Sequence, residues 1–247
     1  MLFCYNTATM TVLPTHPNKA ETISHQGTTY QRLMVRTNRI DADTYLVKEI
    51  TTAAGSNLQN ADILCIAESV VAITQRRAYK ISDITPGFTA RLLSRFVKKS
   101  PAGIGLAMPE TMQLAVDEVG ALRLYCAAAI AAITRTLGRK GDFYRIAGER
   151  ARGIDGPTPG TLPPYNEYAT LIPNNPRAVA NDIEMEIKQT TGITIQAIIV
   201  DANDIGVNIL GAKDKAQEAL AKALVGDNPM GQGHEQTPIM IARTIKD

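Results

Sequence analysis

The 247-residue sequence lacks an excess of charge of either sign. It has 26 lysine and arginine residues against 24 aspartate and glutamate residues, which gives a formal net charge of +2 at pH 7. Acidic and basic residues are also scattered along the chain. Nonspecific binding to nucleic acids or to an anionic membrane surface uses a concentrated basic patch. The sequence therefore predicts that neither nucleic acids nor membranes are partners of this protein.

Cysteine and long apolar runs are scarce as well. Cys4, Cys65 and Cys126 are too few and too far apart for a disulfide framework or a four-thiolate zinc site. Residues 1–14 lack the basic start and compact apolar run of a secretory signal. The apolar stretch of residues 121–133 carries an arginine and is too short to cross a bilayer. We therefore expect a soluble protein of a reducing compartment, the cytoplasm.

Three well-marked nucleotide-binding or catalytic motifs are absent. The sequence has no phosphate-binding loop ending in Gly-Lys-Ser/Thr, no Gly-x-Gly-x-x-Gly that opens a helix, and no Gly-x-Ser-x-Gly. Any nucleotide must therefore be held by another arrangement. Hydrophobic residues make up 45% of the chain, which is enough for a sizeable buried core.

Patterns of apolar residues predict both strands and helices. The nearly continuous apolar run from Ala61 to Ala67 suits a strand buried on both faces, and the pattern from Pro109 to Gly138 favours a buried core helix. We assign residues 1–29 to an N-terminal extension and residues 30–247 to an α+β unit, either single or divided into two intertwined subdomains. Further strands are predicted at residues 30–36, 193–200 and 237–245, and further helices at 45–53, 86–98, 176–191 and 213–224.

An acidic cluster follows one of the predicted strands. Asp201, Asn203 and Asp204 come directly after the apolar run that ends at Val200. Two carboxylates and an amide are hard oxygen ligands that suit magnesium or manganese, and a backbone turn can gather them. The alternative is that these side chains merely cap a turn through hydrogen bonds. Spacing alone does not decide between the two interpretations.

Two glycine-containing loops offer further polar groups. Between Arg150 and Asp155, one carboxylate is flanked by two arginines, which bind phosphate or carboxylate, and by glycine. An ordinary ion-paired loop is the alternative. The second loop, residues 226–238, leads to a donor and acceptor cluster in which Glu235 is a candidate metal ligand. No nucleophile stands at a recognisable spacing from His234, so we assign that histidine no catalytic role.

Several of these segments resemble one family in sequence order. The run Ala61-Asp62-Ile63-Leu64-Cys65-Ile66-Ala67-Glu68-Ser69-Val70-Val71-Ala72 resembles the strand and turn of the coenzyme F420-0:L-glutamate ligase family, which reads Asp-Ile-Leu-Val-Val, a polar pair and Val-Val. Arg152-Gly153-Ile154-Asp155 is similar to the family's Asn-Ala-Gly-Ile-Asp loop, and Ile198-Ile199-Val200-Asp201 to its strand that ends in a metal-binding aspartate. The resemblance covers most of residues 30–245.

This resemblance implies a fold and a reaction. The fold is α+β, with mixed or antiparallel sheets and packed helices, in a homodimer. The reaction uses GTP, or ATP in its place, with Mg²⁺ or Mn²⁺. The carboxylate of a small-molecule acceptor attacks the γ-phosphate, and the amine of L-glutamate captures the acyl phosphate. Phosphorylation supplies the leaving group that a carboxylate lacks at neutral pH.

The site residues expected from the resemblance and from the loops form two groups. The expected metal ligands are Asp155, Asp201, Asp204 and Glu235, of which Asp155 and Asp201 match the family's metal-binding positions. We expect the first two to share one cation. The expected nucleotide-binding and substrate-binding residues are Glu68, Ser69, Arg76, Arg77, Arg150, Arg152, Asn203 and Gln236.

The sequence also departs from the family pattern after Asp201. The family's threonine is Ala202, and its Phe-Gly-Arg-Pro-Trp-Arg continuation is replaced by Asn203-Asp204-Ile205-Gly206-Val207. Recognition of the acceptor therefore differs from the family pattern. A second hypothesis follows, that the chain is a non-catalytic relative that binds a nucleotide or metabolite.

Overall fold

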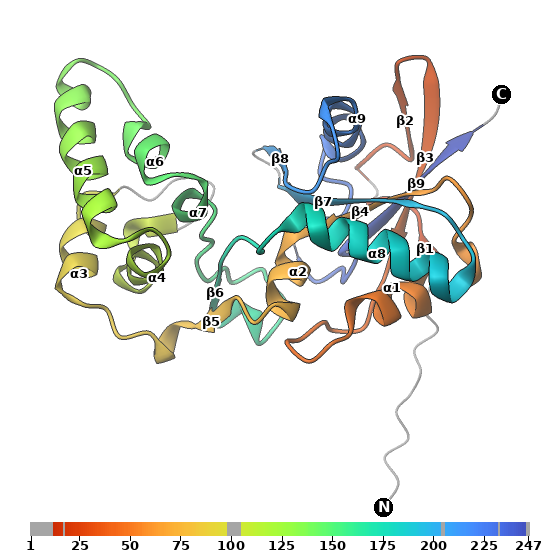
Figure 1. Cartoon of the computed structure of the whole chain (residues 1–247), viewed down its shortest axis with the longest axis horizontal. Coiled ribbons are helices and arrows are strands. Elements are labelled where there is room, and N and C mark those ends of the chain that lie inside the picture. Colours follow the sequence, from red (N-terminus) through yellow and green to blue (C-terminus); the bar gives the residue numbers. More distant parts are fainter. Residues whose placement is uncertain (1–11, 17, 98–104, 204–205, 232, 246–247) are drawn as a thin grey trace, which may run out of the picture. The chain divides into compact units, whose positions relative to one another are not determined.

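The computed structural model describes residues 12–16, 18–97, 105–203, 206–231 and 233–245. They belong to two compact units (Figure 1). The sheet unit combines the chain up to Gln75 with the chain from Pro173 onward, and the segment Arg76–Ile172 forms the helical unit. The helical unit is thus inserted between two parts of the sheet unit. The boundary that we predicted between residues 29 and 30 stays a prediction.

The sheet unit is built on a mixed sheet. Its seven described strands follow the order β1-β3-β9-β4-β7-β8, with β2 also paired to β3. The pair β4 and β7 is parallel, and the other described pairs are antiparallel. This confirms the α+β class with a mixed sheet. The strands are β1 (Val12–Leu13), β2 (Thr22–His25), β3 (Thr28–Val35), β4 (Ile63–Ala67), β7 (Gln196–Ala202), β8 (Val207–Ile209) and β9 (Ile239–Ile245).

Helices cover both faces of this sheet. Cys65 of β4 and Met240 of β9 share a core cluster with Leu224 of α9 (Lys215–Val225). Successive strand residues point to opposite faces, so Leu64 and Ile199 face the other side. All five side chains are fully buried, which explains why these strands read as continuous apolar runs. The second face carries α1 (Leu46–Ala54), α2 (Glu68–Thr74) and α8 (Pro176–Thr191) (Figure 1).

The bounds of α8 follow from its end residues. Pro176 stands in the first turn, where its missing N–H costs no helical hydrogen bond. Gly192 closes the helix in the left-handed conformation, and its N–H donates to the carbonyl of Lys188 at 2.9 Å. Ile183 and Ile187 lie on the buried side. The helix predicted at residues 176–191 is therefore confirmed.

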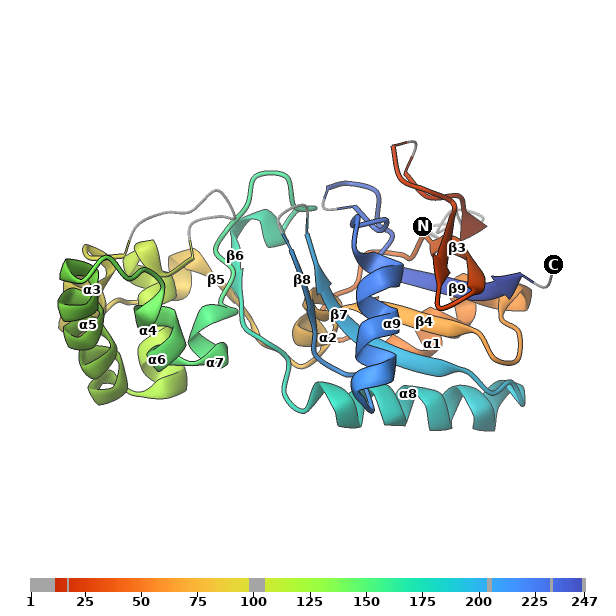
Figure 2. The ribbon, with the colours of Figure 1, turned by 90° about the horizontal axis from the view of Figure 1, so that it is seen from above.

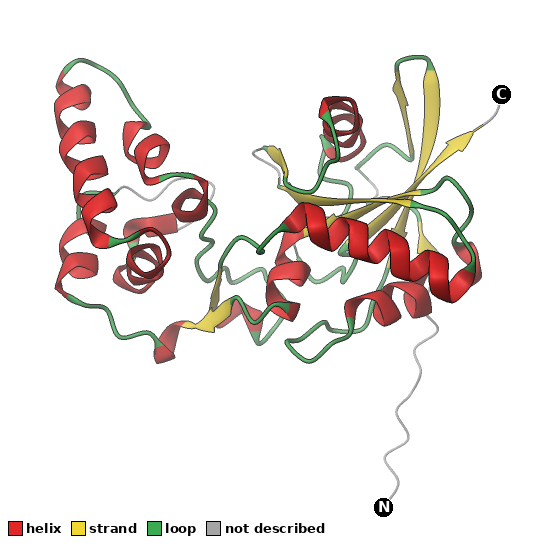
Figure 3. Cartoon of the chain, viewed as in Figure 1, coloured by secondary structure: helices red, strands yellow, loops and turns green. Residues whose placement is uncertain are grey.

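The helical unit packs five described helices around its own core (Figure 3). Leu106, Met112, Leu124 and Ile154 lie in this core and are almost completely buried. The antiparallel strands β5 (Ala78–Lys80) and β6 (Tyr168–Thr170) lie near the two points where the chain enters and leaves the unit. The helices are α3 (Phe88–Ser94), α4 (Pro109–Val119), α5 (Ala121–Thr136), α6 (Asp142–Ala147) and α7 (Glu149–Arg152).

The prediction of one buried core helix over residues 109–138 was wrong in two respects. Gly120 adopts φ +84° and separates α4 from α5, because it ends α4 in a conformation that other residues rarely adopt. In α5, only Leu124 and Ala127 are buried. The alanine-rich stretch therefore packs on one side alone.

Several other bounds shifted, and some elements were missed. The predicted helix 86–98 is the shorter α3, with residue 98 outside the described part of the chain. The predicted strand 193–200 is β7, which starts later and continues to Ala202. The sequence did not reveal the short elements β1, β2, β5, β6, β8, α2, α6 and α7, nor the 3-10 turns at Gly55–Asn57, Ile81–Asp83, Gly105–Ala107 and Tyr165–Glu167.

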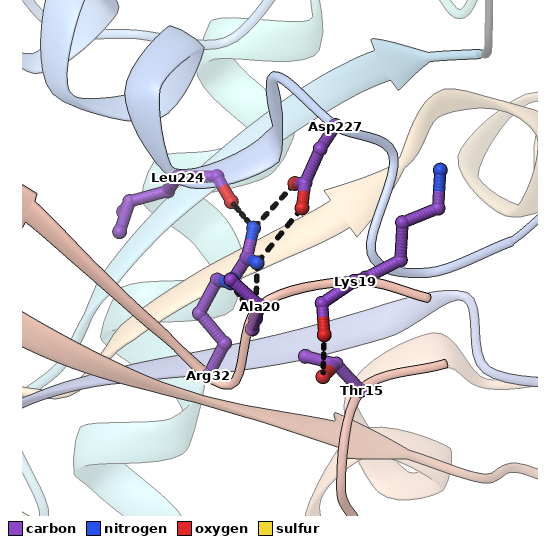
Figure 4. A network of polar contacts seen from close by, with 6 residues as sticks. All are labelled: Thr15, Lys19, Ala20, Arg32, Leu224 and Asp227. Atoms are coloured by element: carbon purple, nitrogen blue, oxygen red, sulfur yellow. Dashed lines mark hydrogen bonds and ion pairs between the residues drawn. The ribbon is translucent and has the colours of Figure 1, made fainter. Parts of the chain in front are cut away.

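A buried arginine ties three segments of the sheet unit together (Figure 4). Arg32 in β3 is 1% exposed, and its guanidinium donates to both carboxylate oxygens of Asp227, at 2.5 and 2.9 Å. It also donates to the carbonyl of Leu224 at 3.0 Å and to that of Ala20 at 3.0 Å. The hydrogen bond to Asp227 is the main cause that holds the pKa of that carboxyl below its ordinary value. Arg32 therefore joins β3 to the end of α9 and to the loop between β1 and β2.

A second ion pair fixes the start of β4. Asp62 is 1% exposed and accepts two hydrogen bonds of 2.8 Å from Arg243 of β9. Its carboxylate also accepts from the N–H of Gln59 at 2.8 Å. The aspartate of the Ala61–Ala72 run is thus a structural residue that holds β4 against β9.

Candidate nucleotide and metal site

Four strand ends meet at one edge of the sheet. In the parallel pair, Ala67 of β4 lies opposite Val200 of β7. The antiparallel β9 begins beside them, since Ile239 pairs with both Ile66 of β4 and Val35 of β3. The residues that follow β3, β4 and β7 and those that precede β9 therefore share this edge, which we call the carboxyl edge. In open sheets, ligands bind outside the carboxyl ends of parallel strands.

Asp201 lies at the carboxyl edge but still within β7. It is half-buried and pairs with Asn208 of β8. Val200 belongs to the core cluster on the α9 face, so by alternation Asp201 projects from the opposite face, which carries α2. We had expected the strand to end at Val200. Because β7 continues to Ala202, the backbone of Asp201 is held by strand pairing with β8 and does not belong to the turn.

Asn203 caps the following turn, while its predicted role in nucleotide or substrate binding stays a prediction. Its Oδ1 accepts from the N–H of Gly206 at 3.0 Å, and its own N–H donates to the carbonyl of Gly206 at 3.0 Å. Asp204 lies outside the described residues, so its predicted role as a metal ligand stays a prediction. The turn joins β7 to β8 beside the carboxyl edge.

Glu68 and Ser69 also lie at the carboxyl edge. They are the first two residues of α2 and follow β4 directly; Glu68 is half-buried and Ser69 is exposed.

Cys65 lies in β4, two residues before the end of that strand, and complete burial raises the pKa of its thiol to about 12. The thiol therefore stays protonated at neutral pH, which excludes it as a nucleophile.

The segment before β9 brings Glu235 and Gln236 to the same edge. The N–H of Thr37, just after β3, donates to the carbonyl of Gln236 at 3.0 Å. The carboxylate of Glu235 accepts from the N–H of Gly233 at 2.8 Å. A Cβ at Gly231 would lie 2.9 Å from the carboxyl carbon of the flexible Glu235 side chain, and Gly231 adopts φ +79°, a conformation that favours glycine.

The other predicted side chains belong to the helical unit. Arg77 is buried and donates to the carbonyl of Ile172 at 2.7 Å, and it forms a 3.0 Å ion pair with Glu118. Arg150 contacts the same Glu118 oxygen at 2.7 Å, beside a pocket of about 370 Å³. Arg150 is thus ion-paired, and the predicted binding roles of Arg77 and Arg150 stay predictions. The side chains of Arg76 and Arg152 are exposed.

Asp155 lies in the helical unit as well. Its backbone forms a bridge to Thr170, with hydrogen bonds of 2.9 Å in both directions, and its side chain is exposed. The bridge places the segment at Asp155 beside β6, which also pairs with β5. Asp201 belongs to the sheet unit, so a cation shared by the two aspartates stays a prediction.

Comparison with known families identifies the family to which this chain belongs. The sequence matches the family described as F420-0:Gamma-glutamyl ligase over residues 34–211. The chain belongs to this family. The match supports a ligase that forms γ-glutamyl bonds. No curated protein matches the chain.

The family match covers most of the candidate residues, though not all. Asp155 and Asp201 lie within residues 34–211 of the F420-0:γ-glutamyl ligase match, and so do Glu68 and Ser69. Glu235 and Gln236 lie beyond it and reach the site only through the pairing of β9. None of the described helices is long and apolar enough to span a membrane.

Members of this family are expected to bind a divalent metal, and the candidate ligands of this chain fit such an ion only in part. Among the described residues, no three His, Cys, Asp or Glu side chains are grouped to bind a metal ion on their own. Mg²⁺ is usually held by one or two carboxylates together with substrate phosphates and water. Asp201 at the carboxyl edge fits a cation that arrives with a nucleotide.

Two further charged residues, one in each unit, were not predicted from the sequence. Arg36 follows β3 at the carboxyl edge, where its Nε donates to the carbonyl of Glu235 at 3.3 Å. In the helical unit, the carboxylate of Glu118 in α4 forms ion pairs with both Arg77 and Arg150. Arg36 could have been found as the charged residue after an apolar strand, but nothing in the local sequence around Glu118 indicates its partners.

Proposed function

We propose that this chain is a nucleotide- and metal-dependent ligase that joins L-glutamate to the carboxylate of a small acceptor, with GTP or ATP as co-substrate. The family match supports the γ-glutamyl ligase class. The observation that carries the proposal is the convergence of Asp201, Glu68 and Glu235 at the carboxyl edge. F420-0 is the first acceptor to test.

The proposed reaction has two bond-forming steps. An acceptor carboxylate oxygen attacks the γ-phosphorus, the bond from that phosphorus to the β,γ-bridging oxygen breaks, and the nucleoside diphosphate leaves. The amine of glutamate then attacks the acyl carbon, forming the C–N bond. The C–O bond to phosphate breaks, so inorganic phosphate and one proton are released. Phosphorylation thus provides the leaving group that a carboxylate lacks.

The residues at the carboxyl edge have distinct proposed roles. Asp201 would hold Mg²⁺ or Mn²⁺, with Asp204, Glu235 and Asp155 as the further ligands predicted from the sequence. The ion supplies charge neutralisation on the transferring phosphoryl group when it is bound. Arg36 has guanidinium N–H groups besides the one that contacts Glu235 and would orient an anionic group of the nucleotide or acceptor.

A binding protein without catalysis is the second candidate. It is favoured by Ala202, which stands where the family has a threonine, and by the loss of the Arg-Pro-Trp-Arg run. The two candidates differ in one measurable respect, because both bind a nucleotide but only the ligase turns it over. Tight nucleotide binding in isothermal titration without any amide product would favour the second candidate.

The test uses the purified full chain with GTP or ATP, Mg²⁺ or Mn²⁺, L-glutamate and a set of carboxylate acceptors that includes F420-0. We expect phosphate release that requires both acceptor and metal, together with a product heavier by one glutamyl residue in mass spectrometry. Omission of glutamate is the control for simple nucleotide hydrolysis. Absence of both nucleotide binding and phosphate release with every acceptor would contradict the ligase proposal.

A further inference from the structure

Helices α4, α5, α6 and α7 of the helical unit meet at a pocket of about 370 Å³. Figure 2 shows α4, α6 and α7 side by side within that unit. The charged residues that line the pocket are Glu118 near the end of α4, Arg123 in the first turn of α5, and Glu149 and Arg150 in α7. Small-molecule sites span about 300–1,000 Å³, so this pocket suits a small ligand.

Arg123 directs its guanidinium at this pocket. Its Nε donates to the carbonyl of Ile146 at 2.8 Å, which fixes the direction of the side chain. Gly148 adopts φ +92°, and a Cβ there would lie 2.6 Å from Nη2 of Arg123, so the guanidinium packs on bare backbone. Within the described part of the chain, neither Nη1 nor Nη2 forms a hydrogen bond or an ion pair. Both groups can therefore donate to an anion in the pocket.

A second arginine adds positive charge to the same pocket. Arg150 forms its ion pair with Glu118 at 2.7 Å, and Arg77 pairs with the same carboxylate oxygen at 3.0 Å. The side chain of Glu118 is only 13% exposed, and one carboxylate cannot neutralise two guanidinium groups. The side chain of Arg150 is 55% exposed and lines the pocket. Part of this positive charge is therefore available to a ligand, in addition to that of Arg123.

Glu149 supplies a negative group to the same pocket. It is the first residue of α7, and its side chain is exposed. Its carboxylate makes no hydrogen bond or ion pair with any described residue. An ammonium group of a ligand would pair with this carboxylate. Three arginines and two glutamates thus give the pocket and its border an excess of one positive charge.

This pattern of charges selects one class of ligand. A nucleotide would bring several phosphate charges against the carboxylate of Glu149, which disfavours it. A simple dicarboxylate would leave Glu149 without a partner. A molecule with two carboxylates and one ammonium carries one net negative charge at neutral pH, and its groups match Arg123, Arg150 and Glu149. Acidic α-amino acids have this composition.

We propose that this pocket binds an acidic α-amino acid, with its two carboxylates on Arg123 and Arg150 and its ammonium on Glu149. Val119 and Ala147 also line the pocket and would contact the aliphatic carbons of the ligand. The proposal rests on the proposed function in one respect, the choice of L-glutamate as the acid to test, since the ligase joins this amino acid to its acceptor.

Isothermal titration of L-glutamate into the full chain, with and without GTP and Mg²⁺, tests this assignment. No acceptor is present, so no turnover is needed. We expect Arg123→Met and the isosteric Glu149→Gln to raise the Kd for glutamate by about 10- to 100-fold, the usual effect of losing one charge-assisted hydrogen bond. Arg135→Met is the matched control, because Arg135 is an exposed arginine of the same helix that does not line the pocket. Its Kd should equal that of wild type.

Glutarate, which has both carboxylates but no ammonium, separates the roles of the two residues. Wild type should bind glutarate about 10-fold more weakly than glutamate. Arg123→Met should weaken the binding of both acids, whereas Glu149→Gln should remove most of the preference for glutamate. Equal losses for the two acids in Glu149→Gln would overturn the contact between Glu149 and the ammonium, because a merely structural role lowers both affinities alike.

The failure of this assignment and the failure of the ligase proposal are distinguishable. Absence of glutamate binding to wild type overturns the assignment, and so does wild-type affinity in both Arg123→Met and Glu149→Gln. Amide product from these variants at the wild-type KM for glutamate would overturn it and leave the ligase proposal intact. Glutamate bound through these residues, without amide product from any acceptor, would support the pocket and contradict the ligase.

Discussion

Replacing Asp201 by asparagine is expected to lower metal-dependent amide formation by about 10- to 100-fold, since a neutral amide oxygen binds Mg²⁺ or Mn²⁺ more weakly than a carboxylate. The fold should remain intact, because Asp201 is half-buried and asparagine has nearly the same shape. The measurement is the initial rate of phosphate release and of amide product across a range of Mn²⁺ concentrations. The loss should be partly recovered at high Mn²⁺ if binding alone is weakened.

Asp182→Asn is the matched control for this experiment. Asp182 is an exposed aspartate of α8, and its replacement changes the net charge by the same amount. We expect wild-type rates and wild-type metal dependence from it. Equal rates in Asp201→Asn and wild type at every metal concentration would exclude Asp201 as a metal ligand.

The largest expected effect on stability is at Arg32. Arg32→Met keeps most of the side-chain volume but removes the hydrogen bonds to Asp227, Leu224 and Ala20. Removal of one partner from a buried ion pair typically costs ~3–5 kcal/mol. The side chain of Asp227 is 36% exposed, so water takes over part of its solvation, and we expect a loss of about 3 kcal/mol in the free energy of unfolding.

Urea unfolding at several pH values measures this loss. Arg32 lowers the folded-state pKa of Asp227, so the stabilisation is complete above the unfolded pKa of about 4. It disappears as pH falls through the folded value. The difference between wild type and Arg32→Met should therefore be full at pH 7 and shrink below about pH 4. Gln31→Met, at an exposed neighbour in β3, is the control. A loss under 1 kcal/mol at pH 7 would contradict the structural role of Arg32.

The interior strands could be predicted because their sequences carry a strong local signal. The run Ala61–Ala67 is apolar on both faces, as a central strand covered by helices requires. Helix α8 has Pro176 and Gly192 at its ends, where their backbone preferences set its bounds. In contrast, an alanine-rich stretch has the same local pattern whether one side or both sides are covered. The sequence therefore did not show that α5 is largely exposed.

The candidate residues could be picked out from the sequence, but which of them lie close together in the fold could not. Polar residues after an apolar strand, such as Asp201 and Glu68, are visible in the sequence. Their meeting depends on β4 and β7 being parallel neighbours, and the place of Glu235 depends on β9 lying between β3 and β4. Strand order is set by long-range packing, which no local pattern encodes. Glu118 was missed for the same reason, since its partners Arg77 and Arg150 are far away along the chain.

The central claim, that the carboxyl edge of the sheet binds a metal and nucleotide, is tested most directly by a crystal structure with Mn²⁺ and a non-hydrolysable GTP analogue. We predict an anomalous manganese peak about 2.0–2.6 Å from a carboxylate oxygen of Asp201, with the nucleotide phosphates beside it. The same density decides whether Asp155 is a second ligand of that ion. A nucleotide bound elsewhere, with no metal in contact with Asp201, would contradict the claim.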